Sequence, residues 1–288
     1  MNRIYRPAPG LETFVRYYVQ RKMKISGPPV VHPVTARAVP LMLFALGESY
    51  NALIHKQRLL KKSNMVTLVG PQTHRRVDLQ LQGALEDFAI VFQPDGVSRL
   101  FSVPMCDLID QDYEGHAVLG AFISAAHERL GECKSFEERV DLVDEFLLRQ
   151  APASAEYDGI SAAASRILLG GSRLPLTALA DRSGLSMRQF ERRFLERVGM
   201  RPKLFARIAR FEAALDGKAR FVAKSWTDVA HQFGYYDQMH MVHDFAEFTG
   251  ETPTGTLTHL ETVFGERLLK VRSAENSEAA DGSSRVFF

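Results

Sequence analysis

Nine basic but only two acidic side chains lie between Arg182 and Arg210, a local excess of seven positive charges. Such a patch neutralises phosphate groups, so it indicates a partner whose binding weakens as salt is added. A helix face that is merely solvated more often alternates in sign. The whole chain carries a formal net charge of only +2, so it is not a general polyanion binder. The chemistry predicted from this stretch is local nucleic-acid binding.

Two short helices are expected to position these charges, one over Leu176–Ser183 and one beginning after Ser186. Gly184 allows the turn between them, and Ser186 with Gln189 has the spacing of a capping box. In the second helix one stripe is apolar and the opposite face is polar: Met187, Phe190, Phe194 and Val198 against Arg188, Gln189, Arg192 and Glu196. The pair reads as a helix-turn-helix, whose second helix fits the major groove of DNA. Because any small helical domain can carry charges outside, one copy leaves that alternative open.

The same pattern recurs from Trp226 onward. When Asp237 is aligned with Ser186, three later landmarks of the two copies coincide: Phe194 with Phe245, Gly199 with Gly250, and Pro202 with Pro253. A connecting helix is predicted over Lys203–Asp216, because Phe205, Ile208, Phe211 and Leu215 recur at helical spacing. Two units on one rigid helix would read major-groove segments about 34 Å apart.

This arrangement strongly resembles the C-terminal domain of the AraC/XylS family of bacterial transcription regulators, over about residues 158–260. The residues that carry the resemblance are Leu179, Ala180, Gly184, Ser186, Arg188, Phe190, Arg192, Phe194, Gly199, Pro202, Arg210, Phe211, Ala230, Phe233, Gly234, Tyr235, Asp237, Gln238, Phe245, Phe248, Thr249, Gly250 and Pro253. The family implies sequence-specific binding of double-stranded DNA and control of transcription, with RNA polymerase as a further partner.

The resemblance also implies which side chains contact DNA. In the first unit the base-reading positions are Arg188, Glu191 and Arg192, and an arginine fork fits guanine N7 and O6. Glu191 would either accept from cytosine or restrain the two arginines by pairing with them. The wider set expected at DNA adds Ser186, Gln189 and Arg193, then Asp237, Gln238, Met239, His240 and His243 from the second unit, with Lys203 and Arg207 on phosphates. Many family members carry arginine where His243 stands, so the second helix is expected to use shape, phosphates and apolar contact.

Residues 1–110 have a different pattern. Leu11–Lys22 is expected to form a short amphipathic helix. Short β-like runs follow between Gly and Pro turns: Leu41–Leu46, Met65–Val69, Val77–Leu81 and Phe88–Phe92. The stretches VGPQT (69–73) and FAIVFQPDG (88–96) resemble the cupin-like sensor domains of many regulators in this family. The expected fold is therefore α+β: a cupin-like β-barrel with helices that binds a small effector, followed by the all-α double helix-turn-helix domain joined by its connecting helix.

Two more helices, over His116–Leu130 and from Ser135 to about Leu147, are expected to cover the barrel or to pair with a second copy in a homodimer. The predicted organisation is a sensor and dimerisation domain over residues 1–150, a linker over 151–157, the DNA-binding domain over 158–262 and a disordered tail over 272–288.

The composition indicates a cytoplasmic protein that is not an enzyme. Cys106 and Cys133 form no disulfide framework, and no apolar run has the length needed to cross a membrane. His32, His55 and His74 lack the spacing of a metal site, so no metal, cofactor or catalytic residue is assigned. The alternative is an enzyme, either a catalytic cupin or a DNA-alkylation repair protein that takes a methyl group on cysteine, attached to the same DNA-binding domain.

Overall fold

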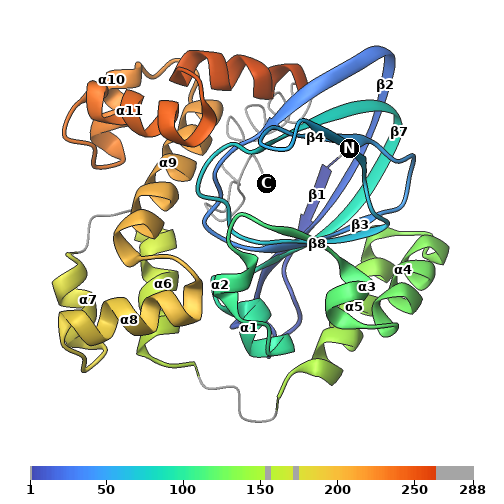
Figure 1. Ribbon diagram of the computed structural model, residues 1–288, viewed down its shortest axis with the longest axis horizontal. Helices are drawn as coiled ribbons and strands as arrows, with labels where there is room; N and C mark the ends of the chain where they lie inside the picture. The colour runs from blue at the N-terminus through green and yellow to red at the C-terminus, as the bar shows by residue number, and fades with distance from the viewer. Residues whose placement is uncertain (1, 153–156, 171–174, 264–288) are drawn as a thin grey trace.

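The structure, a computed structural model, describes residues 2–152, 157–170 and 175–263. An antiparallel sheet comes first, and Figure 1 shows helices on both sides of it. Its strands are β1 (Asn2–Tyr5), β2 (Val15–Val34), β3 (Leu41–Ala45), β4 (Asn51–Ile54), β5 (Leu59–Lys62), β6 (Val66–Val69), β7 (Val77–Phe92) and β8 (Asp112–Glu114). They are ordered β1-β2-β7-β3-β6-β8, and the hairpin β4–β5 joins the sheet through β7.

The two long strands β2 and β7 form the centre of the sheet. They pair from Val15 opposite Phe92 to Val34 opposite Val77, with a register shift between Ile25 and Val30. Along its other edge β7 pairs first with β4 and then with β3, so the sheet divides there. The predicted runs Val77–Leu81 and Phe88–Phe92 are therefore one strand, which continues through Gly83 in a left-handed conformation (φ 83°).

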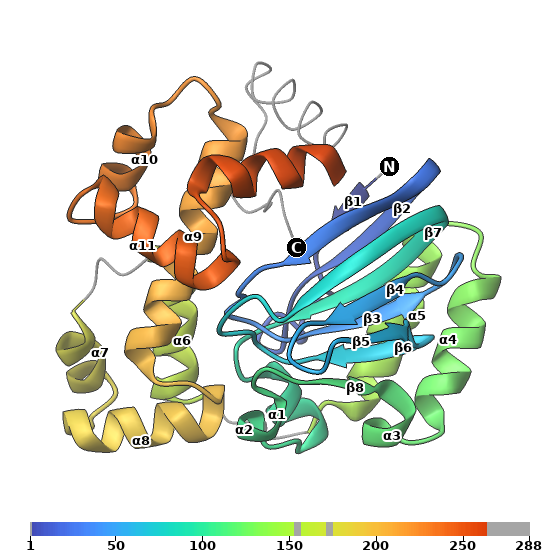
Figure 2. The same cartoon turned by 45° about the horizontal axis from the view of Figure 1, so that its top comes forward.

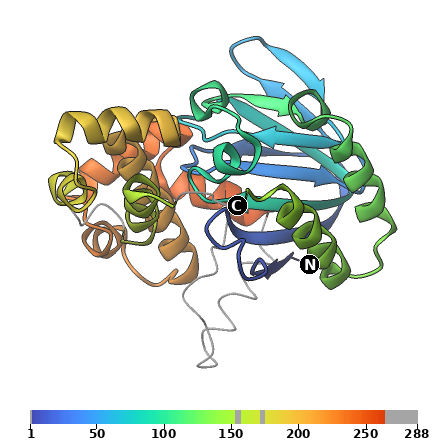
Figure 3. The same ribbon diagram turned by 90° about the horizontal axis from the view of Figure 1, so that it is seen from below.

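Both faces of this sheet carry buried apolar side chains, and the two faces pack against different helices. Tyr18, Phe44 and Phe88 point into one hydrophobic cluster, together with side chains of α4 (Phe122–Glu132) and α5 (Phe136–Gln150). Tyr17, Val19, Leu41 and Val91 belong to a second cluster, shared with the helices that follow α5. Figure 3 shows the sheet lying between these two groups of helices. The prediction of a helix over Leu11–Lys22 is wrong, because residues from Val15 onward alternate between two apolar faces as a strand requires.

Three shorter helices complete the sheet domain, α1 (Gly96–Phe101), α2 (Met105–Leu108) and α3 (Gly115–Leu119). The helix predicted over His116–Leu130 is two helices, since Gly120 (φ 83°) ends α3 before α4 begins. The cap predicted at Ser135 is present, because its hydroxyl accepts from Glu138 N. Asp144 fixes α5 to the sheet, accepting a hydrogen bond of 2.5 Å from the Tyr18 hydroxyl.

The helical domain comprises α6 (Gly159–Gly170), α7 (Leu176–Arg182), α8 (Met187–Val198), α9 (Pro202–Arg220), α10 (Trp226–Gln232), α11 (Gln238–Thr249) and a last helix over residues 253–263. Figure 2 shows α7 and α8 at one end of α9 and α10 and α11 at the other. The α+β class, with two helix-turn-helix units joined by a connecting helix, is confirmed. Most of the predicted linker and the whole predicted tail lie outside the described residues.

Candidate nucleic-acid interface

The first helix-turn-helix unit is fixed by local signals at each boundary. Gly184 forms the turn with φ 66°, and Ser186 begins α8 with a complete capping box. The Ser186 hydroxyl accepts from Gln189 N, and Gln189 Oε1 accepts from Ser186 N at 3.0 Å. Phe190 and Phe194 are fully buried, with Phe194 against Phe205 of α9 at a ring-centroid distance of 5.4 Å. These anchors set which face of α8 is exposed.

That exposed face carries the side chains predicted to read DNA. Arg188, Glu191, Arg192 and Arg193 are all exposed on α8. Arg192 lies 3.9 Å from Glu196 of the next turn, with both side chains more than 60% exposed. Such a pair contributes little and would exchange readily for a DNA contact. Within the described part of the chain, the carboxylate paired with Arg192 is therefore Glu196 and not Glu191.

The second unit repeats this construction. Ser225 and Asp228 form a capping box at α10, and Asp237 caps α11 by accepting from His240 N at 2.7 Å. Phe245 and Phe248 are buried against Phe211 of α9, with ring centroids 4.9 and 5.4 Å away. The helix therefore has a fixed orientation.

The outer face of α11 exposes Gln238, Met239 and His243, whereas His240 is half-buried with its ring edge against Tyr235. Gln238 Oε1 accepts from the Thr227 hydroxyl at 2.8 Å. Tyr236, which the sequence reasoning missed, is 87% exposed directly before this helix. The sequence signal that could have identified Tyr236 is its position next to Asp237, the N-cap that aligns with Ser186.

The basic patch is smaller on the folded surface than in the sequence. Arg197 pairs with Asp158, Arg210 lies over the Tyr235 ring, and Arg207 Nη2 lies 2.6 Å from Asp244 Oδ1. Arg207 also pairs with Glu247 and lies 5.1 Å from the Phe248 ring centroid. The predicted phosphate contact by Arg207 does not fit this geometry, because two carboxylates already neutralise its charge. Six members of the patch stay exposed: Arg182, Arg188, Arg192, Arg193, Arg201 and Lys203.

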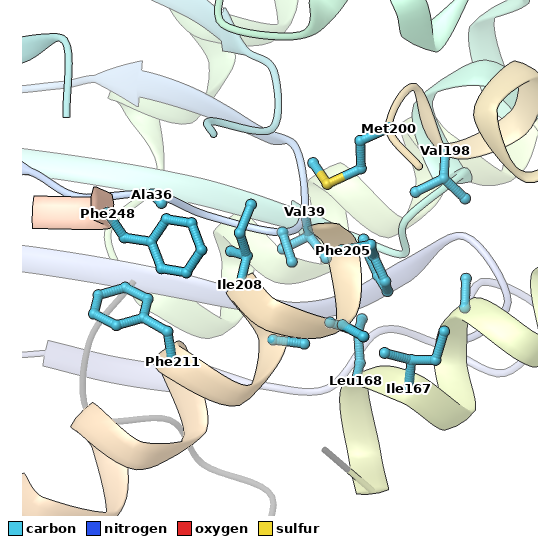
Figure 4. Packing of buried hydrophobic residues seen from close by; sticks show 14 of the residues in the cluster. Ala36, Val39, Ile167, Leu168, Val198, Met200, Phe205, Ile208, Phe211 and Phe248 are labelled. Atoms are coloured by element: carbon cyan, nitrogen blue, oxygen red, sulfur yellow. The ribbon is translucent and has the colours of Figure 1, made fainter. Parts of the chain in front are cut away.

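The second helices of the two units, α8 and α11, are called the recognition helices below. The sheet domain contacts both units at equivalent places, near the C-terminal ends of these two helices. Next to α8, a Cβ added to Gly199 would lie 2.6 Å from Met105 O and 2.9 Å from Ile109 Cδ1. At the end of α11, Ala36 N donates to Phe248 O at 3.0 Å, and Arg75 Nη1 lies 3.0 Å from Glu251 Oε1. Figure 4 shows Ala36 and Val39 beside Phe248, Ile208 and Phe205. The helices α8 and α11 therefore begin away from the sheet domain, and their C-terminal ends lie against it.

Two segments of the sheet domain make the contacts with Glu251 and Gly199, residues 71–75 and 105–110 respectively, and we call them the bridge segments. They are bonded to each other, since Thr73 donates to Asp110 through its backbone N at 2.8 Å and its hydroxyl at 2.7 Å. Asp110 N in turn donates to Pro71 O. The ends of the two recognition helices are thus connected through one bonded piece of the sheet domain.

Replacing Gly199 by alanine tests this close approach. We expect G199A to lower the free energy of unfolding by more than G184A does, although both glycines have left-handed backbones, which cost alanine about 1–2 kcal/mol. A Cβ at Gly184 would meet no atom within 4 Å, whereas one at Gly199 would meet the Met105 carbonyl. Urea unfolding of both variants measures the difference, and equal losses would contradict the contact.

A pocket of about 120 Å³ lies within the sheet domain. Its apolar wall includes Val34, Leu41, Leu43, Ile54 and Leu79. The polar part of the lining comprises Arg21, His32, Arg37, Tyr50, Lys61, Lys62, Ser63, Asn64, Thr67, Gln72 and Asp112.

Arg21, His32 and Gln72 are buried polar residues of the pocket lining. Arg21 Nε donates to Asp87 Oδ2 at 2.8 Å, so the charge of Arg21 is paired inside the protein. Burial, with the nearby charges of Arg21 and Arg37, lowers the pKa of His32 to about 3. The Gln72 side chain is 95% buried, and its Oε1 has no hydrogen-bond partner among the described residues. The pocket therefore offers a neutral histidine and an amide acceptor beside cations and an apolar wall.

The buried His32 makes stability depend on pH. Between pH 3 and 6.5 the unfolded chain binds a proton at this residue and the folded chain does not, so stability falls as the pH drops below 6.5. The expected loss from pH 7 to pH 5 is about 2 kcal/mol. Between pH 7 and pH 5 the free energy of unfolding of H32Q should fall by about 2 kcal/mol less than that of the wild type. H116Q, which replaces an exposed histidine, is the control. An unchanged pH dependence in H32Q, measured by urea unfolding, would rule out this explanation.

The two enzyme alternatives would require a metal site or an activated cysteine thiol. Among the residues described, no three His, Cys, Asp or Glu side chains group closely enough to hold a metal ion. Burial raises the pKa of the Cys133 thiol, the opposite of what a methyl-accepting thiolate requires. Cys106 lies beside an acidic group, with its Sγ 3.5 Å from Asp107 Oδ1. None of the described helices is long and apolar enough to span a membrane.

Comparisons with known proteins agree with this geometry. A family model described as a helix-turn-helix domain matches residues 179–259, and one described as a domain of unknown function (DUF6597) matches residues 3–114. No curated protein matches the chain.

Among solved structures, an apo form of a ToxT variant from Vibrio cholerae is 10% identical, with a TM-score of 0.50, over 84% of this chain and 97% of that one. ToxT from Vibrio cholerae O395 is 12% identical over 86% and 98% of the two chains, with a TM-score of 0.45. ToxT with a bound unsaturated fatty acid is 10% identical over 84% and 94%, with a TM-score of 0.47. The likeness to the apo form is one of fold. The match of residues 179–259 to the helix-turn-helix model, in a domain whose paired units follow a sheet-rich domain, supports an AraC-type DNA-binding transcription regulator.

Proposed function

We propose that this regulator binds a small effector in the sheet-domain pocket and responds by changing the relative placement of its two recognition helices. The observation that carries the proposal is the continuity between the pocket and the bridge segments. Gln72 lines the pocket and belongs to one bridge segment, and its backbone exchanges two hydrogen bonds of 2.8 Å with Arg37, another lining residue.

The lining favours a small anion with an apolar body. Four cationic side chains (Arg21, Arg37, Lys61 and Lys62) and one carboxylate (Asp112) surround the pocket. Arg21 pairs with Asp87 and Lys61 Nζ lies 3.9 Å from Asp112 Oδ2, so Lys62 is the better candidate for contact with an acidic group. A donor on the effector would satisfy Gln72 Oε1, because an unpaired buried acceptor is costly.

Movement in the pocket has a short route to the second unit. Ala36, which donates to Phe248 O, directly precedes Arg37. Arg75, three residues after Gln72, makes two hydrogen bonds of 2.8 Å to Asp78 and reaches Glu251 from there. A ligand that displaces either backbone segment would therefore alter the contacts at the end of α11. This is a coupling between two sites through one physical element.

On the DNA side, we propose that the first unit reads guanine through Arg188 and Arg192. Both forks are exposed on a helix whose orientation buried aromatics fix. Arg193 and Lys203 are proposed to contact phosphates, while Ser186 and Gln189 mainly cap the helix and lend backbone donors at its start. Glu191 is proposed to accept from cytosine, since Arg192 pairs with Glu196.

The test separates ligand binding from response. Small organic acids, sugars and neutral aromatics are screened by thermal shift, and hits are assayed for their effect on operator affinity. We expect an acid among the hits. L43W, which fills the pocket, should lose binding, whereas R75A should keep binding but lose the change in operator affinity. A compound that binds wild type and L43W equally, or R75A responding like wild type, would contradict the proposed pocket or the proposed route.

We further propose that α4 and α5 contribute to a homodimer. Their inner faces cover the sheet, but Phe122 (38% exposed) and Leu148 (46% exposed) remain outside, with Phe122 against Phe146 at 5.1 Å between ring centroids. Light scattering of wild type at micromolar concentration should give twice the monomer mass, and F122E should reduce it. A monomeric wild type would rule out this interface.

A further inference from the structure

The two helix-turn-helix units differ completely in charge. No lysine or arginine occurs from Ser225 to Val263, a stretch with six carboxylates and four histidines. Three of the carboxylates are paired with arginines from elsewhere: Asp244 and Glu247 with Arg207, and Glu251 with Arg75. Asp228 and Asp237 cap helices. The second unit therefore brings no basic side chain to neutralise DNA phosphates, and it should contribute little to counterion release.

Large apolar side chains are instead exposed near the N-terminal end of its second helix, α11. Met239, in the first turn of α11, is 60% exposed, and Tyr236, which precedes the N-cap Asp237, is 87% exposed. Met241, Phe245 and Phe248 on the opposite side are fully buried, so the backbone beneath the exposed pair is fixed. In a helix-turn-helix the first residues of the second helix contact base edges. Met239 therefore occupies a base-reading position, and Tyr236 lies beside it in the turn that precedes the N-cap Asp237.

We propose that the second unit reads thymine methyl groups through Tyr236 and Met239. The thymine C5-methyl is the apolar group that bases present in the major groove, and apolar side chains recognise it there. Beside them, the exposed Gln238 has its amide oxygen bonded to Thr227, and its amide nitrogen is a donor for an acceptor such as thymine O4.

This inference rests on the proposed reading of guanine by the first unit and adds a division of roles to it. The first unit supplies the phosphate contacts and guanine contacts, and the second supplies sequence discrimination without charge. The preferred site should therefore hold guanine in one segment and thymine in a second segment about one helical turn away.

The experiment changes single atoms in the DNA. Duplexes selected from random sequence by the full-length protein provide the operator, and deoxyuridine then replaces each thymine of the second segment. This removes the methyl group and keeps every hydrogen-bonding group. Wild-type affinity should fall about fourfold for each methyl group that is contacted. M239A and Y236A should bind the thymine operator more weakly and lose less on uracil substitution, while L169A, which truncates an exposed leucine on α6, should behave as wild type.

A second substitution distinguishes failure of this inference from failure of the proposed function. In the first segment 7-deazaguanine removes the N7 acceptor that Arg188 or Arg192 would use. If 7-deazaguanine weakens binding but uracil does not, the thymine proposal is overturned and guanine reading stands. If neither change matters, both are wrong. A selected second segment whose guanines are essential, or M239A losing as much on uracil as wild type does, would also overturn the thymine proposal.

Discussion

The variant R207A is expected to lose about 3–5 kcal/mol of unfolding free energy, because it leaves a buried carboxylate without its partner. Asp244 has only 2% of its side chain exposed, and Arg207 approaches it with Nε at 3.1 Å and Nη2 at 2.6 Å. The same guanidinium lies over Phe248 and links α9 to α11. Its removal should therefore loosen the second unit on its connecting helix.

Lys203 provides the matched control, since it lies one turn earlier on α9 and is exposed. K203A should keep wild-type stability while lowering affinity for operator and random DNA alike. The double variant R207A/D244A should recover part of the stability lost in R207A, since no uncompensated buried charge remains. Urea unfolding of the three variants provides the test. An R207A protein as stable as K203A would show that the ion pair contributes little and would reopen the phosphate-contact role.

The helical domain was predictable because its signals are local. Ser186, Gln189 and Gly184 specify a helix start and a turn within a few residues, and Phe190 and Phe194 mark the buried face. These interactions depend on neighbours three or four positions away, which a single sequence displays directly. The predicted bounds of α7 and the predicted start of α9 agree with the structure to within one residue, whereas α9 continues to Arg220, four residues beyond its predicted end at Asp216.

The long central strands β2 and β7 were harder to predict from the sequence, because a different group of helices packs on each of their two faces. Tyr18 packs toward α5 and Tyr17 toward the helical domain, so the segment shows no polar face that would mark it as a strand. The ion pairs of Arg75 and Arg207 with Glu251 and Asp244 were likewise not predictable from the sequence. Their partners Glu251 and Asp244 lie far along the chain, so each arginine reads in the sequence as a free surface cation. The bridge segments depend on pairs of this kind and could not be inferred without coordinates.

The variant R192A is expected to lose more affinity for the operator than for random DNA. A bidentate arginine–guanine contact gives about 1–3 kcal/mol of discrimination, so operator binding should weaken by roughly 5- to 150-fold. Arg192 is 69% exposed on its side chain and pairs only weakly with Glu196, so truncation should leave the fold intact. Binding isotherms at several salt concentrations would show the loss.

The salt series separates the two kinds of contact. In R192A the slope of affinity against salt should change little if Arg192 binds a base edge. In K203A the slope should fall by about 0.9, and operator and random duplexes should weaken together. R192Q tests geometry in addition, because glutamine favours adenine and should shift the preferred base at that position. Equal weakening of operator and random DNA by R192A would show that Arg192 contacts the backbone, and the guanine assignment would then pass to Arg188 alone.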